Sequence, residues 1–221
     1  MNKIRTLGHL QESLDSEMGW RIKEIFSLKL SAKSVLSISE ATLVRAGVAL
    51  LYAHWEGFIK NVSVAYLNYI NNQGMRYQDL KSCFVVFGLK SYLHTLTTSR
   101  KAEANGKAID FVLGQMDKPA KLAISTAIDT ESNLSSKVFH NIAVSLSIAS
   151  DNYEARYHLI DESLVGRRNR IAHGEYLDID AAEWRNLSDE ILLLMRQYKT
   201  DIENAASLQG YKRVTVTPDR Q

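Results

Sequence analysis

The most informative segment for chemistry runs from residue 164 to residue 175, where Arg168 and His173 lie five positions apart. Arginine carries a permanent, forked positive charge that suits a phosphate group. Histidine exchanges protons near neutral pH more readily than other side chains. Together the two could cut an RNA phosphodiester without a metal ion. So short a pair also occurs where arginines bind the free carbonyls at a helix end and a histidine caps it.

The segment is expected to form the last turns of a helix that ends at Gly174. On such a helix Asn169 and His173, four residues apart, share one face. Arg168 lies about 140° around the axis from His173. Because the last turn of a helix is less bound to ideal geometry, we expect Arg168 and His173 to be able to converge on one anion.

A second unusual feature is the pair His54 and Glu56, two polar groups in an otherwise apolar helical stretch. Buried polar groups need partners. Two interpretations remain open: a buried, hydrogen-bonded pair that holds helices together, or a supporting role beside an active site.

No other catalytic motif accompanies these segments. The histidines at positions 9, 94, 140 and 158 lack metal-ligand spacing, so no zinc site is expected. The sequence contains neither a glycine-rich phosphate loop nor a nucleophile elbow. The single cysteine, Cys83, excludes an intrachain disulfide. We therefore expect no metal and no cofactor.

Composition describes an ordinary globular protein. The 221 residues are 45% apolar and 24% charged, and the net charge is +2. No overall basic field marks a nucleic-acid binder, so contact with RNA would need a local patch. No apolar run approaches the roughly 18 residues of a spanning helix, and we expect a cytoplasmic protein without membrane contact.

Apolar residues at spacings of three and four predict an all-α fold. The expected helices cover residues 7–36, 43–69, 80–96, 108–116, 139–148, 153–172 and 180–206. Residues 39–42 are expected to break the first two helices, and residues 97–107, with Asn105-Gly106, to form a loop. The second helix is apolar on two faces and belongs at the centre of a bundle or at an oligomer interface. We expect one domain over residues 1–208, with a variable insertion at about 100–150 and a tail at 209–221.

Two segments together resemble one known family. Residues 160–175, IDESLVGRRNRIAHGE, resemble the Arg-x4-6-His signature of HEPN domains, with a polar residue after the arginine. Residues 51–60, LYAHWEGFIK, resemble an earlier helix of the prokaryotic branch called RiboL-PSP-HEPN or MAE-type. The likeness covers about residues 40–70 and 153–205. It implies an up-and-down helical bundle that dimerises, so that two motifs meet in one composite active site.

The resemblance also implies metal-independent endoribonuclease activity, often in toxin–antitoxin or phage-defence systems. His173 would be the general base or acid. Arg168 would stabilise charge on the scissile phosphate, and Asn169 would orient the imidazole or the ribose. Arg167 and Arg170 would hold flanking phosphates of the RNA. The products would be 2′,3′-cyclic phosphate and 5′-hydroxyl ends.

One position departs from the pattern. Some HEPN toxins carry, two residues after the histidine, a tyrosine that a partner nucleotidyltransferase modifies, whereas here Glu175 holds that place and Tyr176 follows. Neutralisation by that route is therefore not expected, although an antitoxin or defence-system partner protein is. Two alternatives stay open: a non-catalytic HEPN module that binds nucleotide, RNA or a protein, and a plain helical interaction protein.

Overall fold

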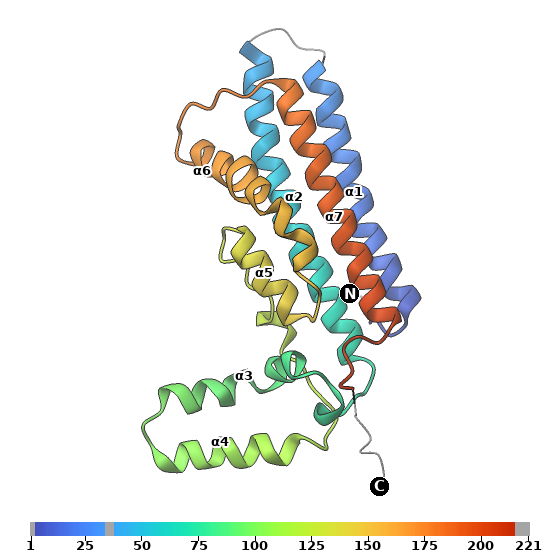
Figure 1. The fold of residues 1–221 in the computed structure, drawn as a ribbon, viewed down its shortest axis with the longest axis vertical. Helices are drawn as coiled ribbons and strands as arrows, with labels where there is room; N and C mark the ends of the chain where they lie inside the picture. Colours follow the sequence, from blue (N-terminus) through green and yellow to red (C-terminus); the bar gives the residue numbers. More distant parts are fainter. Residues whose placement is uncertain (1–2, 34–37, 215–221) are drawn as a thin grey trace.

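The computed structural model describes residues 3–33 and 38–214, and its regular structure is helical throughout (Figure 1). The α-helices are α1 (Leu7–Lys33), α2 (Ile38–Asn71), α3 (Ser82–Thr98), α4 (Ala102–Gln115), α5 (Ser136–Ser145), α6 (Arg167–Ala172) and α7 (Ala181–Ser207). Extended pairing in these residues is limited to two isolated bridges, Arg76–Pro119 and Leu80–Lys212. The all-α prediction is confirmed.

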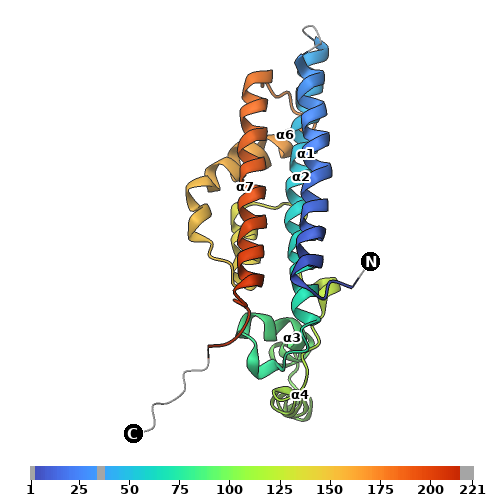
Figure 2. The same cartoon turned by 90° about the vertical axis from the view of Figure 1, so that its right-hand side faces the viewer.

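Three long helices, α1, α2 and α7, lie side by side and form the bundle (Figures 1 and 2). Helix α2 is its centre, because both of its predicted apolar stripes are buried. Trp55, Phe58, Val62 and Tyr66 have no exposed surface. A helix that is apolar on two faces needs cover on both of them, and here that cover comes from within the chain.

Helix α7 follows the predicted pattern closely. The Asp180 carboxylate accepts a hydrogen bond from the Glu183 backbone N–H at 2.7 Å and caps the helix. The predicted apolar stripe is buried; it comprises Trp184, Leu187, Ile191, Leu194, Tyr198 and Ile202. The helix approaches α2 closely, since a Cβ added to Gly47 would lie 2.7 Å from the Trp184 ring.

Two predicted interruptions between helices are wrong. Residues 39–42 are not a break, because α2 already begins at Ile38; residues 34–36 of the first predicted helix lie outside the described residues. Residues 97–107 are not one loop, because α4 begins at Ala102 and includes Asn105 and Gly106. Packing of α4 against α3, with the Phe111 and Tyr92 rings stacked 3.7 Å apart, overrides the turn preference of the Asn-Gly pair.

The segment that leads to α6 is continuous but changes geometry. It was predicted as one helix from Tyr153, and it consists of a 3₁₀-helix (Asp151–Arg156), a π-helix (Leu159–Gly166) and α6. The π-helix is tied to α5, because the Asp161 carboxylate accepts from both the backbone N–H and the hydroxyl of Ser136, at 2.7 and 2.5 Å.

Helices α3 and α4 form a hairpin that extends away from the bundle (Figure 1). We call residues 81–121 the arm. The arm and α6 project from the same side of the bundle, and α5 lies between them in height (Figures 1 and 2). None of the described helices is both long enough and apolar enough to span a bilayer.

Candidate active site

The Arg168–His173 segment occupies α6 and the turn after it, as predicted. His173 is the C-cap, and its backbone N–H donates to the Asn169 carbonyl at 2.9 Å. Gly174 follows with φ +76°, a left-handed conformation that favours glycine. The helix therefore stops abruptly and leaves the His173 side chain at its exposed end.

The Arg168 side chain turns inward and is half-buried. Its guanidinium carbon lies 3.8 Å from the centroid of the Tyr52 ring, on α2. Its Nη2 donates to the Ser132 carbonyl at 3.0 Å and to Asn133 Oδ1 at 3.2 Å. Its Nε is buried and has no hydrogen-bond partner in the described chain. The charge is thus held by stacking and by two neutral oxygens, and no carboxylate of the described residues pairs with it.

Asn169 contacts the same loop residue as Arg168. Its Nδ2 lies 3.5 Å from Asn133 Oδ1, at the limit of a hydrogen bond. Asn133 therefore bridges two neighbouring residues of the predicted motif.

The loop that carries Asn133 is fixed to α2 at both ends. The Thr130 hydroxyl donates to the Glu56 carboxylate at 2.6 Å. The Leu134 backbone N–H donates to the Tyr52 hydroxyl at 2.8 Å, and the Leu134 carbonyl accepts from Trp55 Nε1 at 3.4 Å. Between these anchors the chain turns sharply, with Glu131 and Ser132 at positive φ of 53° and 54°. We call residues 130–134 the site loop.

The phenol of Tyr52 is an acceptor in this network. Burial raises its pKa, and the nearby Glu56 carboxylate raises it further, while the Leu134 N–H and Arg168 oppose the shift. The hydroxyl therefore stays protonated at neutral pH and binds the loop through its lone pair.

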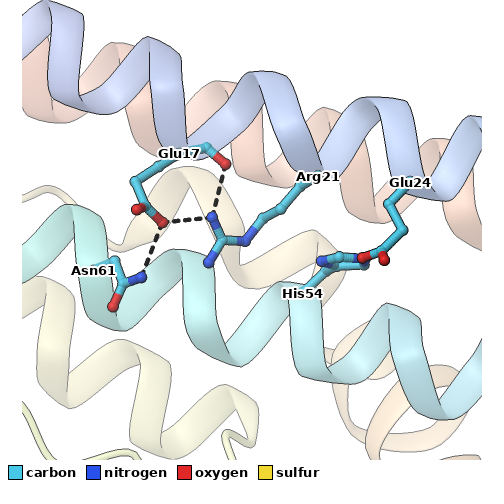
Figure 3. Close-up of polar contacts among 5 residues, drawn as sticks. All are labelled: Glu17, Arg21, Glu24, His54 and Asn61. Atoms are coloured by element: carbon cyan, nitrogen blue, oxygen red, sulfur yellow. Dashed lines mark hydrogen bonds and ion pairs between the residues drawn. The ribbon is translucent and has the colours of Figure 1, made fainter.

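His54 and Glu56 do not form the buried pair that was one of the two interpretations. His54 faces α1, where its Nε2 lies 2.9 Å from a Glu24 carboxylate oxygen (Figure 3). The His54 ring also meets the Trp20 ring edge-on. Burial lowers the pKa of His54, with Glu24 acting in the opposite direction. Glu56 instead contacts the site loop. His54 therefore links α2 to α1, and Glu56 links α2 to the site loop. Of the two residues, only Glu56 belongs to the hydrogen-bond network that reaches Arg168.

The α1–α2 contact around His54 also includes a buried charge, that of Arg21, which is 3% exposed. Its Nη1 donates to the carbonyl and the carboxylate of Glu17, at 2.7 and 2.5 Å, and Asn61 donates to the same carboxylate at 2.9 Å (Figure 3). This cluster links α1 to α2, although the buried Arg21 Nε has no hydrogen-bond partner among the described residues, and it lies on a different side of α2 from the site loop.

The other two arginines of the motif already have partners. Arg167 pairs with Glu183 at 2.5 Å. Arg170 pairs with Glu175 at 3.2 Å and donates to the Tyr176 carbonyl at 3.0 Å. Ion pairs that are exposed or partly exposed contribute only about 0–1 kcal/mol, so another anion can replace the carboxylate with little loss of stability. The His173 side chain makes no hydrogen bond or ion pair with the described residues.

Sequence reasoning missed the residues that hold Arg168. The apolar faces of the helix that carries Tyr52 predict only a place at the bundle centre or at an oligomer interface, and no motif includes Ser132 or Asn133. Their only signal is a stretch rich in turn-forming residues, which predicts a loop but not its contacts. Among the described residues no cluster of three or more histidines, cysteines and carboxylates is arranged to hold a metal ion.

Comparison with known proteins gives one match. The model of the family described as RiboL-PSP-HEPN matches residues 16–204. Neither a curated protein nor a solved structure was found to match the chain.

Proposed function

Because this chain belongs to the RiboL-PSP-HEPN family, a family of HEPN type, we propose that it is a metal-independent endoribonuclease. The wider role proposed is that of a toxin or phage-defence effector restrained by a partner protein. The observation that carries the nuclease proposal is the arrangement of three side chains on α6. Arg168, which stacks on Tyr52 and has no carboxylate partner among the described residues, and Asn169 both contact Asn133 of the site loop. His173 follows at the end of the helix, where its side chain is exposed.

In the proposed reaction the neutral imidazole of His173 takes the proton from a ribose 2′-hydroxyl. The 2′-oxygen attacks the adjacent phosphorus, and the bond from phosphorus to the 5′-oxygen breaks. A protonated histidine returns a proton to that leaving oxygen. The products are a 2′,3′-cyclic phosphate and a 5′-hydroxyl, so no water and no metal enter this step. Arg168 stabilises the charge that builds on the phosphate oxygens.

The reaction needs an acid and a base at once, whereas each chain offers one histidine in this segment. We propose a homodimer in which two copies of α6 face a common cleft, one His173 acting as base and the other as acid. The exposure of His173 and Tyr176, which is 71% exposed, is consistent with a surface that a second copy covers.

The decisive experiment compares the native protein with His173→Ala on total RNA and on a tRNA pool, with EDTA present. We expect EDTA-resistant cleavage by the native protein that leaves cyclic-phosphate ends and is absent in the variant. Since the His173 side chain is exposed, its removal should leave the melting temperature unchanged. Equal cleavage by both proteins would mean that His173 is not the catalytic base.

A second candidate is a non-catalytic module that binds RNA or nucleotide. It is favoured by the contacts of Arg168, because Nη2 already donates to two protein oxygens and Nε is buried. Under this alternative Arg168 is a structural residue, and the native protein binds RNA but leaves it intact in the experiment above.

A further inference from the structure

The arm carries a net positive charge, which the rest of the nearly neutral chain does not. Residues 81–121 contain seven lysines and arginines and three aspartates and glutamates, against 27 and 25 in the whole chain. The arm therefore has a formal charge of +4, and the rest of the chain has −2. A near-neutral total conceals a positive charge concentrated on one projecting hairpin.

Much of this charge is free to meet a ligand. Lys90, Arg100, Lys101 and Lys121 are exposed and form no ion pair with the described chain. Arg100 and Lys101 stand in the short turn between α3 and α4, at the tip of the hairpin. Lysines and arginines without carboxylate partners are the side chains that replace condensed counterions on a nucleic acid.

The base of the arm contains a hollow of about 470 Å³. Its lining includes Phe111, Gln115, Lys118 and Lys121. An aromatic ring, an amide and two ammonium groups are the types that stack on a base, hydrogen-bond its edge and attract its phosphate. The volume lies within the range of about 300–1,000 Å³ typical of ligand pockets.

The position of the arm relates it to α6. Both project from the same side of the bundle, with α5 between them (Figures 1 and 2). We propose that the arm is an RNA-docking surface that holds single-stranded substrate beyond the cleavage site, with its basic tip on the phosphates and the hollow at its base receiving a nucleotide. This proposal rests on the proposed nuclease function and adds to it the surface that determines which RNA is retained.

The binding test uses full-length protein carrying His173→Ala, so that the probe stays intact. Fluorescence anisotropy measures the affinity for a labelled single-stranded RNA over a range of salt concentrations. The arm variant combines Lys90→Gln, Arg100→Gln, Lys101→Gln and Lys121→Gln. The matched control removes the same number of lysines and arginines from exposed positions of the bundle; it combines Lys3→Gln, Lys23→Gln, Lys60→Gln and Arg196→Gln.

We expect the arm variant to lose about tenfold or more in affinity, and the salt dependence to become shallower by about 0.7 for each phosphate contact removed. The bundle control should bind as its parent does. Both variants should keep the parent's melting temperature, because the substituted side chains are exposed.

Cleavage by the otherwise native protein provides an independent readout. The arm substitutions should lower kcat/KM on long RNA and leave cleavage of a dinucleotide unchanged, because a dinucleotide occupies the α6 site alone. A purely structural role of the arm would affect both substrates alike and so would contradict the proposal.

The outcomes separate this proposal from the proposed function. If the His173→Ala parent binds RNA, the native protein cuts it, and the arm substitutions change neither activity, the docking surface is refuted and the nuclease stands. The exposed apolar side chains of Val86, Ile109 and Leu113 would then point to a protein partner for the arm. If the His173→Ala parent does not bind RNA and the native protein does not cut it, both proposals fail.

Discussion

The contact between Asn133 and Arg168 allows a quantitative test of how the candidate site is built. Asn133→Ala removes the Oδ1 atom that accepts from Arg168 Nη2 at 3.2 Å and lies 3.5 Å from Asn169 Nδ2. A hydrogen bond to a charged donor contributes about 1.5–3 kcal/mol. The second contact, at the geometric limit, adds little. Because Arg168 is half-buried and keeps its bond to Ser132, we expect the low end, about 1.5 kcal/mol.

A double-mutant cycle isolates this quantity. The four proteins are the native chain, Asn133→Ala, Arg168→Ala and the double variant, and urea denaturation gives each free energy of unfolding. We expect a coupling of about 1.5 kcal/mol between the two positions. Asn204→Ala is the control partner, because Asn204 is exposed near the end of α7, far in the fold from α6, and no side-chain hydrogen bond joins it to the described residues; its coupling to Arg168→Ala should be zero. If the losses in free energy of unfolding caused by Asn133→Ala and Arg168→Ala simply add, the hydrogen bond between these two residues does not stabilise the fold.

The same four proteins, assayed for RNA cleavage, test whether the hydrogen bond between Asn133 and Arg168 affects catalysis. If Asn133 positions Arg168, Asn133→Ala lowers kcat by about tenfold, which corresponds to about 1.4 kcal/mol of lost transition-state stabilisation, and leaves KM nearly unchanged. In the Arg168→Ala background the Asn133 substitution should have no further effect. An equal loss in both backgrounds would show that Asn133 acts through overall stability.

Three further predictions concern the framework around the site, and urea denaturation checks each. Gly174→Ala should lower the free energy of unfolding by about 1–2 kcal/mol, because Gly174 has φ +76°. Gly106→Ala should raise it by about 0.5–1 kcal/mol, because Gly106 lies inside α4 with open space around its Cα. Equal effects of the two substitutions would contradict the view that Gly174 ends α6 through its left-handed conformation. Gly47→Ala should cost about 1–3 kcal/mol, because the new Cβ would meet the Trp184 ring. His54→Gln should flatten the pH dependence of stability: the folded-state pKa of His54 is lowered, so the unfolded chain binds the proton first and stability is lost as pH falls below about 6.5. An unchanged slope in that variant would mean that the burial of His54 has no energetic consequence.

The sequence predicted those parts of the fold that follow from local pattern. The apolar stripe of α7, its Asp180 cap and the two-faced burial of α2 all depend on spacing within one helix, and spacing is visible in a single chain. The α6 stop at Gly174 was predictable for the same reason. The Asn105-Gly106 error has the opposite origin, because contacts between α3 and α4 outweighed a strong local turn preference.

Only those residues of the candidate site that are close together in the sequence could be predicted. Arg168, Asn169 and His173 were identified because they are close in sequence. The loop contact joins Arg168 to a residue 35 positions away, and it depends on Tyr52, Trp55 and Glu56 holding residues 130–134 against α2. Side chains that act through tertiary packing leave no spacing signal, so Asn133 could not be distinguished from any other loop asparagine.

The π-helix Leu159–Gly166 lets this part of the chain change length without changing the orientation of α6. An α-helical residue turns the chain by 100°, so loss of one residue from a regular α-helix rotates everything that follows it. Wider i→i+5 turns accommodate an extra residue without changing where the helix starts or ends. Loss of one residue from the π-helix would therefore rewind it toward ordinary α-helix and leave Arg168 facing Tyr52. A deletion inside α6 has no such compensation and would rotate His173 relative to Arg168.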